Sequence, residues 1–203
     1  MSKKPIIVFE GIEGTGKSHH ISTVAKYLKK NNKKVIQFRE PGGSENSEKI
    51  RRLILNNKST FNTNTDLLLY LSARSENIAL IKKNIGKKII LIDRFSDSTI
   101  AYQHYGMGIN FKFIKDINDF LTKDINIDFT FLNTVNKINL NSRLQKRKKL
   151  NRYDKFNNNF YNRVQKGFIE ILKKNPKKYM KVDSNLDIKL NEKIILNKIN
   201  DLT

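Results

Sequence analysis

The sequence has 203 residues, with 40 lysines and arginines against 19 acidic residues and a formal net charge of +21. This length suits one domain with a sizeable core. No apolar run approaches the roughly 20 residues that a membrane helix needs, and the lack of cysteine excludes disulfides and thiolate metal sites. We therefore expect a cytoplasmic protein with no secretory signal and no membrane attachment.

A phosphate-binding motif is the first feature along the chain. Residues 11–18 read Gly-Ile-Glu-Gly-Thr-Gly-Lys-Ser, after an apolar strand predicted at residues 5–10 and before an amphipathic helix. The glycines allow backbone amides to face a phosphate, and the helix dipole adds to the attraction. We predict that Lys17 contacts the β- and γ-phosphates of ATP and that Ser18 ligates Mg²⁺. The predicted ATP-binding residues are Gly11, Ile12, Glu13, Gly14, Thr15, Gly16, Lys17 and Ser18.

The remaining segments alternate between strands and helices. We predict strands at residues 34–38, 88–93, 129–132 and 179–182, and helices at residues 47–55, 65–82, 96–104, 111–121, 160–172 and 186–199. This order indicates an α/β protein with a P-loop NTPase fold, in which a five-stranded parallel sheet carries helices on both faces. We expect a single domain over residues 1–203, with the basic segment 141–155 as a short mobile lid.

An acidic residue ends the predicted strand 88–93. Asp93 follows a run of apolar residues, as in a Walker B segment, and would help Ser18 to position Mg²⁺. The chain lacks the Asn/Thr-Lys-x-Asp motif that a guanine-reading GTPase needs. Arginines near the predicted strand ends favour a second anion site, as in a small-molecule kinase. These arginines are Arg39, Arg51, Arg74 and Arg94.

Several blocks resemble successive motifs of bacterial thymidylate kinases. They are residues 11–18, residues 38–44 (Phe-Arg-Glu-Pro-Gly-Gly-Ser) and residues 93–103 (Asp-Arg-Phe-Ser-Asp-Ser-Thr-Ile-Ala-Tyr-Gln). Residues 70–74 are similar to the family's aromatic-x-x-x-Arg helix, and residues 150–154 and 160–164 to its lid and following helix. The resemblance implies a homodimer that transfers the γ-phosphate of ATP to dTMP, giving dTDP and ADP.

The resemblance also implies roles for residues of the acceptor site. It assigns Arg94 and Arg51 to the dTMP phosphate, Tyr70 and Arg74 to the base, Thr99 and Gln103 to the pyrimidine edge, and Tyr102 to the sugar. The complete predicted set is Glu40, Pro41, Arg51, Tyr70, Arg74, Arg94, Ser98, Thr99, Tyr102 and Gln103. A monophosphate is mostly dianionic at pH 7, so such a site needs cations rather than a general base.

The predicted catalytic residues are Lys17, Arg94, Arg152, Asp93 and Glu13. Glu13 repels phosphate and is assigned to the sugar 3′-hydroxyl, which resembles the family branch whose catalytic arginine comes from the lid. Arg152 is our first choice for that arginine, with Arg143 and Arg147 as alternatives because the segment is too basic for spacing to decide. The lid departs from the family pattern at Asn151 and Asp154, as the fourth strand does at Asn133.

Two other functions stay open at this point. Another nucleoside monophosphate or deoxynucleoside kinase would use the same chemistry on a different base. A nucleic-acid-stimulated ATPase would use the charge of +21. Lysine, like asparagine and isoleucine, is frequent in every segment of the chain. This spread indicates a general bias in composition rather than a dedicated polyanion-binding surface, so we expect no specific nucleic-acid partner.

Overall fold

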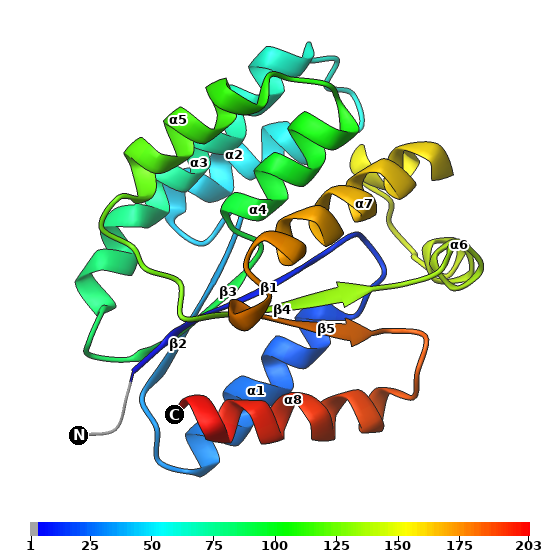
Figure 1. The fold of residues 1–203 in the computed structure, drawn as a ribbon. Coiled ribbons are helices and arrows are strands. Elements are labelled where there is room, and N and C mark those ends of the chain that lie inside the picture. The colour runs from blue at the N-terminus through cyan, green and yellow to red at the C-terminus, as the bar shows by residue number, and fades with distance from the viewer. Residues whose placement is uncertain (1–3) are drawn as a thin grey trace.

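A five-stranded parallel sheet forms the centre of the protein (Figure 1). The computed structural model describes residues 4–203. The strands are β1 (Ile6–Gly11), β2 (Val35–Arg39), β3 (Ile89–Asp93), β4 (Phe129–Thr134) and β5 (Tyr179–Asp183). They lie in the order β2-β3-β1-β4-β5, and every neighbouring pair is parallel. The predicted sheet is confirmed, and its order places β1 beside β3 at the centre.

Helices cover both faces of the sheet (Figure 1). α1 (Lys17–Lys30) and α8 (Ile188–Leu202) pack together on one face. The other face carries α2 (Glu45–Leu55), α3 (Thr63–Asn84), α4 (Ser96–Thr99), α5 (Phe111–Thr122) and α7 (Asn158–Lys174). The π-helix η1 (Ile100–Gly106) continues α4, and α6 (Lys137–Gln145) follows β4. The short 3₁₀ turns are η2 (Tyr153–Lys155) and η3 (Pro176–Lys178).

The strand residues alternate between two hydrophobic cores. On β1, Ile7 and Phe9 pack with α1 and α8, whereas Ile6 and Val8 pack with the opposite layer that includes α3. All four side chains are at most 4% exposed. Because successive strand residues point to opposite faces, a strand between two helical layers must be apolar throughout. This explains the continuous apolar runs of β1 and β3.

The many asparagines of the chain start several of these helices. Asn62, Asn110, Asn136 and Asn157 each accept a hydrogen bond from the backbone N–H three residues later, at the beginning of α3, α5, α6 and α7. An asparagine at this position satisfies one of the amides that a helix leaves unbonded, which stabilises the helix by about 1 kcal/mol. The composition bias therefore supplies helix starts as well as polar surface.

Two helical segments differ from the prediction. The expected helix 96–104 is α4 followed by η1, since the backbone changes to π-helical geometry at Ile100. The expected lid segment 141–155 contains the end of α6 and the turn η2. The sequence interpretation missed α6, which buries only Leu140 and so has little apolar periodicity.

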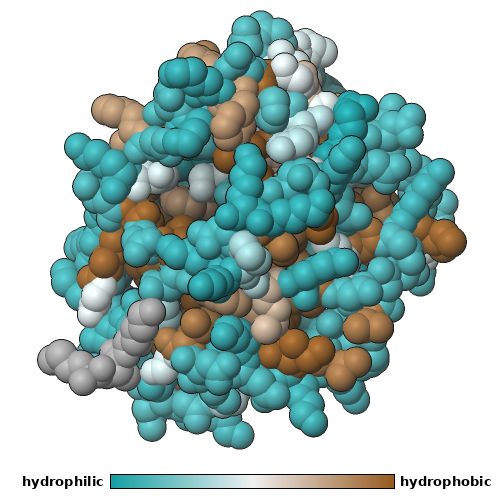
Figure 2. All heavy atoms as spheres, in the orientation of Figure 1, coloured by the Kyte–Doolittle hydropathy of each residue, from teal (hydrophilic) through white to brown (hydrophobic). Residues whose placement is uncertain are grey.

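Hydrophilic residues cover most of the face seen in Figure 2. Among the residues described, no helix has the length and hydropathy needed to cross a membrane.

Candidate active site

A cleft of about 480 Å³ lies at the carboxyl ends of β1, β2 and β3. Ligands of parallel α/β sheets bind at this edge, because the loops that follow the strands meet there. The cleft is lined by every predicted acceptor-site residue: Glu40, Pro41, Arg51, Tyr70, Arg74, Arg94, Ser98, Thr99, Tyr102 and Gln103. Of the phosphate-loop residues, Glu13, Gly14, Gly16, Lys17 and Ser18 line it, whereas Gly11, Ile12 and Thr15 do not.

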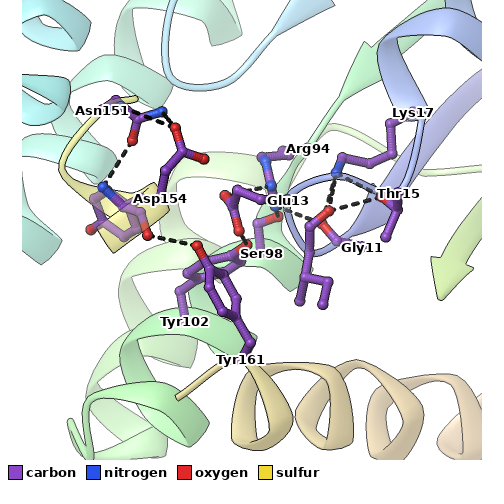
Figure 3. Close-up of polar contacts among 12 residues, drawn as sticks. Gly11, Glu13, Thr15, Lys17, Arg94, Ser98, Tyr102, Asn151, Asp154 and Tyr161 are labelled. Atoms are coloured by element: carbon purple, nitrogen blue, oxygen red, sulfur yellow. Dashed lines mark hydrogen bonds and ion pairs between the residues drawn. The ribbon is translucent and has the colours of Figure 1, made fainter. Parts of the chain in front are cut away.

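Lys17 is folded back onto the phosphate loop. Its Nζ lies 2.9 Å from the carbonyl oxygen of Gly11, 2.8 Å from that of Ile12 and 3.3 Å from the Thr15 hydroxyl (Figure 3). Burial, helped by the positive charge of Arg94, lowers the pKa of Lys17 to about 7. The amine is therefore placed where an anion in the cleft would draw a proton onto it.

Ser18 and Asp93 form a pair of oxygen ligands beside this loop. The Ser18 hydroxyl donates to the Asp93 carboxylate at 2.9 Å, across the junction of α1 and β3. Both side chains line the cleft. A hydroxyl and a carboxylate, with phosphate oxygens completing the shell, are a suitable donor set for Mg²⁺, so the residues present fit the predicted metal.

Arg94 connects the phosphate loop to the rest of the cleft. Its backbone has φ 68, which residues with a side chain seldom adopt. The guanidinium donates to the carbonyl oxygen of Gly11 at 2.8 Å and to the Glu13 carboxylate at 2.9 Å. Glu13 also accepts from the Tyr102 hydroxyl, and Figure 3 shows Glu13 between these two partners. The strained turn therefore aims a fixed cation at the floor of the cleft.

The charge of Arg94 also keeps Glu13 ionised. Burial alone would raise the pKa of Glu13, but the positive charges of Arg94 and Lys17 hold that pKa below its ordinary value. The phosphate loop therefore carries an ionised carboxylate that is paired with Arg94.

Glu10 supports this turn from below. Its carboxylate accepts from the backbone N–H of Phe95 at 2.8 Å and from that of Ser98 at 3.2 Å, and burial raises its pKa to about 8. The sequence interpretation did not select Glu10. The signal was present, because an acidic residue inside an apolar strand needs a partner within the protein.

The far end of the cleft holds buried polar atoms without protein partners. Thr99 Oγ1 and Gln103 Nε2 make no hydrogen bond among the described residues, and the two side chains are 2% and 1% exposed. Tyr70 and Tyr102 line the same cleft. Because an unpaired buried polar group costs about 1–3 kcal/mol, this arrangement provides hydrogen bonds for a ligand with a flat, polar-edged ring.

Arg74 is held by a buried network rather than left free. Its Nε donates to Glu40 at 2.7 Å, its Nη1 donates to Asn118 at 2.5 Å, and the side chain is 2% exposed. Burial raises the pKa of Glu40 although Arg74 favours the charged carboxylate. The second Glu40 oxygen, Oε1, has no partner among the described residues. Glu40 and Arg74 therefore reach the cleft as one unit.

A family model described as thymidylate kinase matches residues 9–195. The chain belongs to the thymidylate kinase family. The thymidylate kinase of Mycoplasma capricolum subsp. capricolum is 37% identical over 204 residues, covering 96% of each chain. That of Kosmotoga olearia is 31% identical over 192 residues, covering 93% of this chain and 92% of the relative. The crystal structure of thymidylate kinase from Ehrlichia chaffeensis superimposes with a TM-score of 0.78 at 32% identity, covering 98% of this chain and 99% of that one.

Within this thymidylate kinase fold, the three lid arginines have different positions. Arg147 lines the cleft and pairs with Asp154. Arg143 also lines it, but its guanidinium donates to the carbonyl oxygens of Gly14 at 2.8 Å and Ser184 at 2.6 Å. Arg152, our first choice as the catalytic lid arginine, does not line the cleft. In this structure the guanidinium of Arg152 is paired with the buried carboxylate of Asp66, so its catalytic role stays a prediction.

Tyr153 lines the cleft although the sequence interpretation gave it no role. Its ring meets Tyr70 edge-on with 5.7 Å between ring centroids, and Tyr102 with 5.9 Å. Tyr153 lies in the segment that resembles the family lid, so the motif contained it. Only the folding of that segment back onto α3 brings it to the aromatic wall.

Proposed function

We propose that this chain transfers the γ-phosphoryl group of ATP to dTMP, giving ADP and dTDP. Family membership supports this reaction, and the observation that carries it for this chain is the pair of unpartnered polar atoms on Thr99 and Gln103. They line the same cleft as Tyr70, Arg94 and the phosphate loop, so one ligand would place a pyrimidine beside them and its phosphate beside Arg94.

The acceptor phosphate is its own nucleophile. Since it is mostly dianionic at pH 7, the protein has to align two anions and neutralise the charge between them. We assign Arg94 and Arg51 to the acceptor phosphate and Lys17 to the donor. Arg51 is held for this role by its hydrogen bond to the carbonyl oxygen of Pro41 at 2.6 Å. Tyr70 would stack on the base, and Glu13 would accept from the sugar hydroxyl.

Two further assignments concern the donor side. Ser18 and Asp93 would hold Mg²⁺, which would supply positive charge to screen the donor phosphates. We assign the lid cation to Arg147, because it lines the cleft and is 38% exposed, whereas Arg152 is paired with Asp66. Arg147 would move from Asp154 to the transferred phosphoryl group.

A parallel assay of ADP release tests the proposed reaction. We expect release with ATP and dTMP to exceed that with dUMP or CMP, and an oligonucleotide to cause no stimulation. Faster turnover with CMP would identify a different monophosphate kinase. Stimulation by the oligonucleotide without dTMP would identify a nucleic-acid-dependent ATPase.

A pair of arginine variants tests the acceptor site in the same assay. We expect Arg94→Ala to lower kcat/KM by about 10²-fold or more, because a fixed cation at the acceptor phosphate is lost, while ATP still binds. Arg52→Ala removes an exposed arginine beside Arg51 and should leave turnover unchanged. Parental turnover by Arg94→Ala would contradict the assignment.

We also propose that the protein forms a homodimer and acts in the cytoplasm. For the dimer, α2 packs against α3 and α3 against α5, and these three helices carry five exposed large apolar side chains. These are Leu53, Leu68, Leu80, Phe113 and Phe120, exposed by 38–75%. Water-exposed apolar residues on neighbouring helices are typical of a surface that a partner covers. For the location, a cysteine-free chain acting on nucleotides suits the cytoplasm.

A further inference from the structure

Asp66 is a buried carboxylate just outside the cleft. It lies in the first turn of α3, four residues before Tyr70, and is 1% exposed. Its two oxygens accept from the guanidinium of Arg152 and from the hydroxyl of Tyr153. A buried carboxylate is costly unless it is paired, and here both partners come from the lid segment, more than 80 residues later in the chain.

The partners of Asp66 reach the walls of the acceptor pocket. Tyr153 places its ring edge against both Tyr70 and Tyr102. Arg152 also donates from Nε to the carbonyl oxygen of Ile54, at the end of α2, at 3.0 Å. Arg152 and Tyr153 therefore contact α2, α3 and η1, and the carboxylate of Asp66 binds both of these lid residues.

The same short segment holds the cation on the donor side. Asp154 follows Tyr153 directly and pairs with Arg147, while accepting from the backbone N–H of Asn151 at 3.0 Å and from its side-chain amide. The Tyr161 hydroxyl donates to the carbonyl oxygen of Tyr153 at 2.7 Å. Figure 3 shows Asn151, Asp154 and Tyr161 around this turn. This turn therefore connects Tyr153, which packs against Tyr70 and Tyr102, to Arg147 through the next residue, Asp154.

We infer that Asp66 is a positioning residue that couples the acceptor pocket to the lid. By holding Arg152 and Tyr153, it fixes turn η2 against the wall on which the acceptor base would stack, and so places Arg147 when that pocket is filled. This inference rests on the proposed function. Asp66 itself touches neither substrate, and its effect passes through Tyr153 and Asp154.

The test uses a fluorescent probe on the lid. The natural chain has no cysteine, so Lys148→Cys, at an exposed lid position, accepts a single thiol-reactive environment-sensitive dye. We expect saturating dTMP to change the emission of this probe in the parental background. With Asp66→Asn, we expect the dTMP-dependent change to be lost while dTMP still binds. A second labelling site at Lys193→Cys, exposed on α8, should report no change in either background.

Kinetics of unlabelled variants provide the second readout. We expect Asp66→Asn and Arg152→Gln each to lower kcat for dTMP by about tenfold or more, with the KM for ATP unchanged, and the double variant to be no worse than either single one. Thermal unfolding checks that each variant is folded. If Asp66→Asn is unstable, Arg152→Gln in the probe experiment tests the same coupling.

The outcomes separate this inference from the proposed function. A parental enzyme that does not phosphorylate dTMP overturns the proposed function. A parental enzyme that does so, together with an Asp66→Asn variant whose probe still responds fully to dTMP and whose kcat is unchanged, overturns the coupling role. Additive losses in the double variant, with an unaltered probe response, would reduce Asp66 to a structural residue.

Discussion

At the scale of single residues, several groups in the cleft lower the stability of the folded protein and are placed where a ligand could contact them. Arg94 adopts a left-handed backbone, which costs a residue with a side chain about 1–2 kcal/mol. Thr99 and Gln103 keep polar atoms buried and unpaired. Each of these features is unfavourable in the empty protein, and each becomes favourable once an anion or a polar ring edge is bound.

The variant Thr99→Val separates the effect of the Thr99 hydroxyl on folding stability from its effect on dTMP binding. The variant keeps the shape of the side chain but removes a buried hydroxyl without a partner, so we expect the melting temperature to stay equal or rise. The KM for dTMP should rise by about tenfold, the equivalent of one lost hydrogen bond of about 1.4 kcal/mol. Calorimetric melting and initial-rate kinetics check the two halves. A lower melting temperature would indicate that Thr99 has a structural partner.

The low pKa of Lys17 predicts proton uptake when ATP binds. With a pKa of about 7 in the free protein, Lys17 is mostly neutral at pH 8.5, where the triphosphate is fully ionised. Bound phosphate favours the ammonium form and raises the pKa again, so we expect ATP to bring close to one proton with it at pH 8.5 and less at pH 6.5.

Titration calorimetry in two buffers of different ionisation enthalpy measures this uptake. Lys17→Arg is the matched control, because arginine is charged throughout this pH range and has no proton to gain. Equal heats in both buffers at pH 8.5 for the parental protein would show that Lys17 is already charged before ATP arrives.

At the scale of elements, two glycines decide how η1 lies against α7. A Cβ added at Gly167 of α7 would come within 2.6 Å of the Tyr105 ring, and one added at Gly106 of η1 within 2.7 Å of the Phe160 ring. The Tyr105 ring of η1 therefore packs on Gly167 of α7, and the Phe160 ring of α7 packs on Gly106 of η1. This close approach holds Tyr102, on η1, beside Arg94, with 5.1 Å from the guanidinium carbon to the ring centroid.

Gly167→Ala should destabilise the protein although alanine is the better helix former. The propensity gain of about 1 kcal/mol is outweighed by overpacking against Tyr105, which costs about 1–3 kcal/mol. We expect a net loss of up to about 2 kcal/mol in the free energy of unfolding, measured by urea denaturation. Lys166→Ala, at the exposed neighbouring position, should stay within about 0.5 kcal/mol of the parental value. A stabilised Gly167→Ala would mean that η1 and α7 move apart freely.

At the scale of the whole molecule, charge and apolar surface have different distributions. The charge of +21 is spread along the chain, whereas the exposed large apolar residues include one group on α2, α3 and α5 and another at the start of α8. Like charge on two copies opposes their association, so a homodimer of this chain needs an apolar contact to hold it.

Light scattering after size exclusion tests the proposed dimer. We expect a mass of twice the 23.7 kDa protomer, and a shift toward the monomer for Phe120→Asp, which puts a charge on the most exposed large apolar residue of α2, α3 and α5. Ile138→Asp, on α6 and 79% exposed, is the control and should leave the mass unchanged. A parental protein that runs as a monomer would contradict the proposal.

The features that the sequence predicts are those encoded by residues close together in the chain. The phosphate loop and the five strands could be predicted because each depends on a short motif or on apolar runs between neighbouring turns. Residues expected at the acceptor site, such as Arg94 and Thr99, line the cleft. The roles of these residues stay predictions. The π-helical geometry of η1 and the helix α6 were missed, since neither leaves a clear periodic pattern in the sequence.

The five strands, the phosphate loop and the family motifs follow from the sequence without the structure, because residues close together in the chain carry them. The fold is needed to see which lid arginines line the cleft: Arg143 and Arg147 do, and Arg152 does not. Arg143, Arg147 and Arg152 are equivalent cations in the sequence, and their positions depend on partners that are distant in the chain or buried. Asp66 holds Arg152 away from the cleft, and Asp154 keeps Arg147 at its edge, because a buried carboxylate must find a cation wherever the fold brings one near.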